Sequence, residues 1–118
     1  MERPDVASAL LARMYGRLEN ILALYAANCS VADRPQEISP SGELDRQRAR
    51  LCLRTLTKHL HHTLDRMTEL SPSMPQGILA KNRAVQLCHR HHLSEREELH
   101  RLTRSHLRDI EKFLHRFG

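Results

Sequence analysis

At 118 residues the chain is long enough for one domain with a buried core and too short for two independent ones. The residues that favour β-sheets are scarce, with aromatic residues at only 3%, and this excludes most β folds. The formal charge of +5 comes mainly from arginine, so the surface suits an acidic protein partner or a nucleic acid. Few aromatic side chains are present to stack on unpaired bases, which argues against a dedicated single-strand binder.

Two further features concern the compartment. No segment is long and apolar enough to cross a bilayer, and the first residues do not resemble a secretory signal, so we expect no membrane contact. The three cysteines, Cys29, Cys52 and Cys88, are widely spaced and form no CxxC pair. We expect free thiols in a reducing compartment, the cytoplasm or the nucleus.

The first predicted helix runs from about Asp5, its N-cap, to Asn28. Its apolar residues recur at spacings of three and four, at Leu11, Met14, Leu18, Ile21 and Tyr25. From Cys29 to Gly42 the chain becomes rich in small polar residues and contains Pro35 and Pro40, which predicts a mobile loop.

A second, longer helix is expected from about Ser41 to Leu70, and a weaker third one over residues 76–91. The core face of the second comprises Leu53, Leu56, Leu60, Leu64 and Met67, and that of the third Ile78, Val85 and Cys88.

The last helix is expected to start at Glu95, because Ser94 and Glu97 have the spacing of a capping box. Its apolar face comprises Leu99, Leu102, Ile110, Phe113 and Phe117. Residues 1–118 are therefore predicted to form a single all-α domain, an antiparallel bundle of about four helices.

Two histidine clusters occupy residues 59–62 and 89–92. His59 with His62, and His89 with His92, would supply four nitrogen ligands for zinc if the two pairs met. Neither cluster has the HExxH spacing, and no acidic residue lies between the histidines to orient them. We therefore expect solvated or pH-titrating surface histidines and no bound metal.

No catalytic motif is present. His106 lies between Leu102 and Ile110 on the apolar stripe, where a histidine is usually a core-edge residue bonded to a backbone carbonyl. No serine or cysteine occupies a recognisable nucleophile motif, and the four glycines are too far apart for a phosphate-binding loop. We expect no enzymatic activity, no catalytic residue and no cofactor.

Arginines crowd the first half of the second helix, at positions 46, 48, 50 and 54. Cations near a helix N-terminus are unfavourable by roughly a few tenths of a kcal/mol each. The arginines form either a solvated face with Glu43 and Asp45 or a ridge for an acidic partner or phosphates. The second interpretation gives these partner-binding residues: Arg46, Arg50, Arg54, Leu56 and His59. Helices this long leave apolar surface uncovered, which favours a complex with other protein subunits.

Three segments resemble the helical A domain of the GINS complex, the four-subunit replication assembly, and particularly its Sld-five and Psf-one type subunits. They are residues 46–50 (RQRAR), 55–60 (TLTKHL) and 93–99 (LSEREEL), and the resemblance covers about residues 41–116. It implies a nuclear, non-catalytic scaffold that joins sister subunits by helix packing. The chain departs from the family at Thr55 and His59, where a tyrosine and an arginine are usual, and it lacks the family's small β domain.

Two other functions fit the same residues. A small helical chaperone or adaptor shares the amphipathic helices, and a basic helical nucleic-acid binder shares the arginine surface, including weak or indirect nucleic-acid contact. A subunit purified alone is expected to aggregate, a chaperone to form a stable monomer or dimer, and a nucleic-acid binder to show a steep salt dependence.

Overall fold

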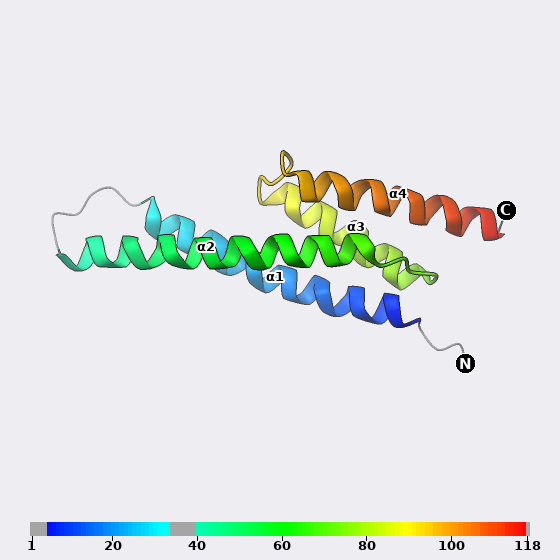
Figure 1. Cartoon of the computed structure of the whole chain (residues 1–118), viewed down its shortest axis with the longest axis horizontal. Helices are drawn as coiled ribbons and strands as arrows, with labels where there is room; N and C mark the ends of the chain where they lie inside the picture. The colour runs from blue at the N-terminus through cyan, green and yellow to red at the C-terminus, as the bar shows by residue number, and fades with distance from the viewer. Residues whose placement is uncertain (1–4, 34–39, 118) are drawn as a thin grey trace.

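The computed structural model describes residues 5–33 and 40–117. They form four helices, α1 (Val6–Ala32), α2 (Pro40–Glu69), α3 (Pro75–Arg90) and α4 (Glu97–Phe117) (Figure 1). No strand occurs among these residues, so the predicted all-α class is confirmed. No helix in the described ranges combines the length and the apolar character needed to cross a membrane.

The ends of the first two helices differ from the prediction. Asp5 is the N-cap of α1, as expected, and its Oδ1 accepts a hydrogen bond from the Ser8 N–H at 2.7 Å. However, α1 continues to Ala32, and α2 already begins at Pro40. A proline fits the first turn of a helix because its missing N–H has no partner there. The predicted loop over 29–42 is therefore too long at both ends, and its remainder, residues 34–39, lies outside the described part of the chain.

The start of α4 also differs from the prediction. The helix begins at Glu97, two residues later than expected. Ser94 forms no capping box, because its Oγ lies 2.6 Å from Nδ1 of His89 instead. The carbonyl of Arg96 accepts the first backbone bond of α4, from the N–H of His100 at 3.2 Å. The acidic Glu97 and Glu98 in the first turn complement the helix dipole.

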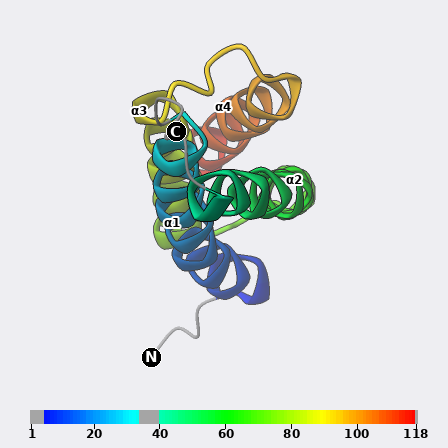
Figure 2. The ribbon, with the colours of Figure 1, turned by 90° about the vertical axis from the view of Figure 1, so that its left-hand side faces the viewer.

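Consecutive helices run antiparallel, and the molecule is elongated, with extents of 64 × 29 × 17 Å (Figure 1). Helix α1 packs against α2 and α3, and α4 packs against the same two helices. As a result α2 and α3, although consecutive in the chain, lie diagonally across the bundle (Figure 2). Helices α1 and α2 extend beyond α3 and α4 as a two-helix arm, which we define as residues 24–32 and 41–57.

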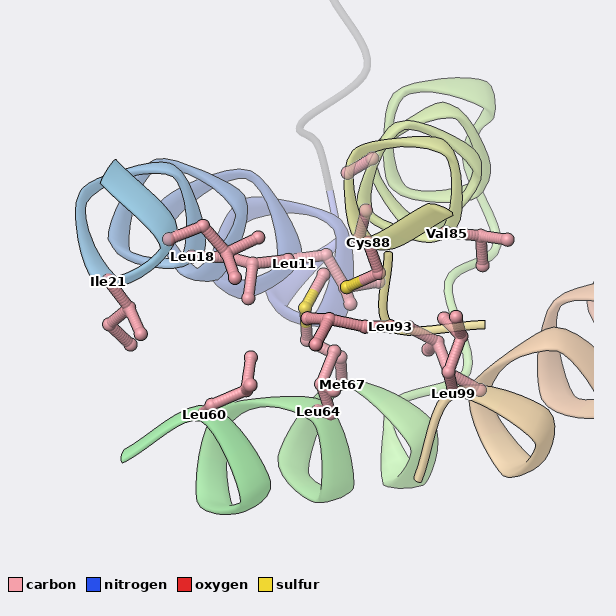
Figure 3. Packing of buried hydrophobic residues seen from close by; sticks show 14 residues of the cluster. Leu11, Leu18, Ile21, Leu60, Leu64, Met67, Val85, Cys88, Leu93 and Leu99 are labelled. Carbon is pink, nitrogen blue, oxygen red and sulfur yellow. The ribbon is translucent and has the colours of Figure 1, made fainter. Parts of the chain in front are cut away.

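The core lies where all four helices overlap. In Figure 3, Leu11 and Leu18 of α1 lie across from Leu64 and Met67 of α2, and Leu93 of the α3–α4 connection lies beside Met67. Leu60, Leu64 and Met67 are fully buried as predicted, whereas Leu53 and Leu56 are only partly buried because they belong to the arm. Each fully buried leucine stabilises the fold by roughly 1.5–3 kcal/mol. The buried cluster comprises Leu11, Leu18, Ile21, Leu22, Leu60, Leu64, Met67, Ala80, Ala84, Val85, Cys88, Leu93, Leu99 and Leu102.

Candidate interaction surfaces and buried polar sites

The arginines of the arm do not form one exposed ridge. Arg46 is only 6% exposed, and its guanidinium donates to Oε2 of Glu43 at 2.6 Å. The hydrogen bond and positive charge of Arg46 hold the pKa of Glu43 below its usual range. Arg50 and Arg54 are exposed, as expected. Arg46, one of the predicted partner-binding residues, is thus buried and paired with Glu43 within the arm, whereas Arg50 and Arg54 are open to solvent.

Arg50 and Arg54 continue the face of α2 that α4 covers. Polar contacts along this face join His61 to Glu98, the Asp65 Oδ1 to Arg101 at 3.0 Å, and the Thr68 carbonyl to the Ser105 Oγ at 2.8 Å. The spacings of four and three residues place the three α2 positions on one stripe. Arg54 precedes His61 by two turns, and Arg50 precedes Arg54 by one, so both lie on the same stripe. Because α4 begins beside His61, this part of the stripe is uncovered (Figure 1).

A shallow groove lies on another side of the arm. It has a volume of about 340 Å³ and is lined by Leu24, Asn28, Leu51, Cys52, Thr55 and Leu56. Leu24 and Leu51 are 55% and 60% exposed. Further along α2, the Nδ1 of His59 lies 3.2 Å from the guanidinium of Arg17 in α1. Leu56 and His59 therefore face α1, away from Arg50 and Arg54, and the five predicted partner-binding residues do not form one patch.

The histidine clusters do not converge. His59 contacts Arg17 of α1, whereas His61 on the opposite face of α2 bridges Glu98 and Arg96. Arg96 requires an acceptor at Nε2 and the carboxylate requires a donor at Nδ1, so His61 is held as the Nδ1–H tautomer. Nδ1 of His89 lies 2.6 Å from the Oγ of Ser94. Within residues 5–33 and 40–117, no group of three or more histidine, cysteine, aspartate or glutamate side chains could hold a metal ion.

A buried lysine connects three helices, and the sequence analysis missed it. Lys81 of α3 is fully buried, and its Nζ donates to Ser105 Oγ at 2.7 Å and to Asp109 Oδ2 at 2.6 Å, both in α4. Ser105 in turn donates to the Thr68 carbonyl of α2. Burial lowers the pKa of Lys81, and the bond to Asp109 opposes this shift. A sequence signal existed, since Lys81 is three residues after Ile78 on the predicted core stripe.

The Lys81–Ser105 pair brings together a nucleophile and an amine, but its hydrogen bonds do not suit catalysis. An activated serine needs a base that accepts its proton. Here Lys81 donates both to the Asp109 carboxylate and to Ser105, and the Ser105 hydroxyl points its proton at a backbone carbonyl. This network therefore holds α2, α3 and α4 together.

His106 occupies the core edge, as predicted, but without the predicted hydrogen bond. It is 8% exposed, and its Nδ1 is buried with no hydrogen-bond partner among the described residues. Burial lowers the pKa of His106; the Asp109 charge opposes this shift, and the Lys81 charge adds to it. The ring lines a cavity of about 500 Å³ between the first half of α3 and the second half of α4, which we call the α3–α4 pocket. The lining residues are Pro75, Ile78, Leu79, Asn82, His106, Ile110, Phe113 and Leu114.

Comparison of the chain with protein-family models, curated proteins and solved structures found no match. The resemblance to the GINS helical domain therefore stays a prediction, and the case for a function depends on the surfaces described above.

Proposed function

We propose that this chain is a non-catalytic interaction subunit of a multi-protein complex and that it binds a partner helix along the uncovered stripe of its two-helix arm. The observation that carries the proposal is that α2 extends well beyond the start of α4, which packs against it. Helix α4 covers the stripe of α2 from His61 onward, and the same stripe continues uncovered through Arg54 and Arg50. A partner helix placed there would extend the packing that α4 begins.

The chemistry of the arm indicates what kind of helix fits. Residues 41–57 of the arm contain four arginines and only two acidic residues, and residues 24–32 contain no charged side chain, so the arm is basic. Half-buried Leu53 lies beside the stripe and offers apolar contact. A helix with an apolar face and acidic flanks satisfies both features. Under the resemblance to the GINS helical domain, this helix would come from a sister subunit and the complex would work in the nucleus.

The double variant Arg50→Glu/Arg54→Glu tests the proposal. Both side chains are exposed, so the helical circular dichroism should not change. Affinity for a partner recovered by affinity purification of the full chain should fall by about 2 kcal/mol or more, because desolvated arginine–carboxylate pairs are lost. The matched control is Arg83→Glu/Arg90→Glu, which makes the same change of net charge at exposed positions of α3 and should leave the affinity within about twofold.

Other outcomes separate the alternatives. Equal losses in both double variants would mean that only net charge matters, and the stripe would not be the binding site. Full partner affinity combined with loss of DNA or RNA affinity in the Arg50/Arg54 variant would replace the proposal with nucleic-acid binding. A chain that is stable alone and holds unfolded clients through its apolar groove would support a chaperone instead.

A further inference from the structure

A small polar pocket lies at the end of α2 that is opposite the arm, and it plays no part in the proposed function. It has a volume of about 110 Å³. One lining residue belongs to α2, one to the α2–α3 connection and four to α4, where they recur at spacings of three and four residues and so form one stripe. We call it the α2–α4 pocket, and its lining residues, all polar, are Thr68, Ser71, Ser105, Arg108, Asp109 and Lys112.

The side chains of this pocket that remain available are hydrogen-bond donors. The hydroxyl groups of Thr68 and Ser105 already donate to backbone carbonyls. In contrast, Ser71, Arg108 and Lys112 are exposed, and their side chains have no hydrogen bond or ion pair within the described residues. Arginine and lysine side chains donate and cannot accept. A ligand in this pocket must therefore be an acceptor of several hydrogen bonds.

The α2–α4 pocket also carries an excess of positive charge. Asp109 is the one carboxylate among its lining residues, and Lys81 neutralises it across 2.6 Å. Arg108 and Lys112 lie one turn apart on α4, an arrangement of like charges that destabilises a helix. Burial lowers the pKa of Lys81, the bond to Asp109 opposes this shift, and the charges of Arg108 and Lys112 add to it. An anion beside the two exposed cations would offset their repulsion.

The size of the pocket limits what this anion can be. Because water occupies about 30 Å³ per molecule, a volume of about 110 Å³ holds about four waters or one small anion. The donors come from two elements, Ser71 from the α2–α3 connection and the two cations from α4. A tetrahedral oxyanion has acceptor oxygens on every side and can meet both elements. Arginine binds phosphate oxygens in pairs, lysine adds a point charge, and two uncompensated cations match a dianion.

We propose that the α2–α4 pocket binds a phosphate group in its dianionic form, as free phosphate or as a phosphate monoester, between Arg108 and Lys112 of α4 and the hydroxyl of Ser71. The bound group would join the α2–α3 connection to α4. The rest of a monoester would extend into solvent, since the three donors are exposed.

Three small anions test the ligand chemistry on the full chain at constant ionic strength, with backbone amide NMR shifts of Ser71 and residues 105–112 as readout. At about pH 8 inorganic phosphate is mainly a dianion, and we expect saturable shifts. Dimethyl phosphate keeps the tetrahedral shape but carries one charge, so it should bind at least about fivefold more weakly. Methyl phosphate separates the two sources: affinity equal to that of phosphate assigns the pocket to monoesters, and much weaker binding assigns it to free phosphate. No saturable shift with phosphate or methyl phosphate, or equal affinities for phosphate and dimethyl phosphate, would overturn the proposal.

Variants locate the site. Arg108→Gln/Lys112→Gln should weaken phosphate binding by at least about tenfold, because two charge-assisted hydrogen bonds are lost. The matched control is Arg83→Gln/Arg90→Gln, which makes the same change of net charge at exposed positions of α3 and should leave the affinity within about twofold. If the α4 variant does not fold, Ser71→Ala in the exposed connection serves instead and should weaken binding by about threefold. Equal losses in the two double variants would show general attraction to positive charge and contradict the assignment. So would an α4 variant that loses stability while phosphate affinity is unchanged, because the two cations would then only stabilise the end of α2.

Discussion

Lys81 of α3 and Asp109 of α4 form an ion pair that solvent does not reach. The Nζ lies 2.6 Å from Oδ2, and the two side chains are 0% and 4% exposed. Ser105 Oγ accepts a second hydrogen bond from Lys81 Nζ and donates one to the Thr68 carbonyl of α2. The relative positions of α2, α3 and α4 therefore depend on the buried Lys81 side chain, whose charge Asp109 neutralises.

Removing only one member of this pair should be costly. Lys81→Met leaves the Asp109 carboxylate buried and unpaired, and we expect the free energy of unfolding to fall by about 3–5 kcal/mol. The double variant Lys81→Met/Asp109→Leu should recover most of this loss, because no buried charge remains. Urea denaturation followed by circular dichroism measures both effects. A single-variant loss below about 1 kcal/mol would show that water reaches the pair.

The same substitution at two glycines should have opposite effects. A Cβ on Gly77 would lie 2.4 Å from Pro72 Cβ and 2.9 Å from the Ser8 Cα, so Gly77→Ala should push α1 and α3 apart and destabilise the fold. A Cβ on Gly16 meets nothing within 4 Å, and Gly16→Ala should stabilise the fold by about 0.5–1 kcal/mol through helix propensity. Thermal unfolding of the two variants is the measurement. A stabilised Gly77→Ala variant would disprove the close approach of the two helices.

Asp5 should make stability depend on pH. Burial acts to raise the pKa of its carboxyl, but hydrogen bonds from Ser73 and Ser8 outweigh burial and hold the pKa well below its usual range. A folded-state pKa below the unfolded value of about 3.9 means that this stabilisation is present above pH 4 and is lost as the pH falls further. Urea midpoints of wild type and Asp5→Asn should therefore differ most at pH 7 and converge toward pH 2. A constant difference over that range would rule out this linkage.

The cysteines should differ in reactivity. Burial raises the pKa of the Cys88 thiol to about 11, whereas Cys52 is exposed at the groove of the arm. Because the thiolate is the reactive form, a thiol reagent at pH 8 should label Cys52 rapidly and Cys88 only when the protein unfolds. Mass spectrometry of wild type and Cys52→Ser distinguishes the sites. Rapid modification of Cys88 in the native protein would mean that the core opens easily.

Local patterns predicted much of the fold. The spacing of Leu11 and Leu18, and of Leu60, Leu64 and Met67, identified the buried faces of α1 and α2, and all five residues are fully buried. Asp5 was identified as the N-cap from its type and position alone. These predictions succeeded because helical periodicity and capping depend on residues only three or four positions apart.

The candidate sites depended on contacts that no local pattern encodes. Arg46 and Arg50 look equivalent in sequence, but the fold buries the first beside Glu43 and leaves the second exposed. His106 lacks a partner, and Lys81 has Asp109 as its own, because the packing of α3 on α4 decides which polar atoms meet. The sequence by itself determined where α1 and α2 turn their apolar sides. Only the tertiary structure decided which charges are compensated and which surfaces remain open, because both depend on where residues distant in the chain come together.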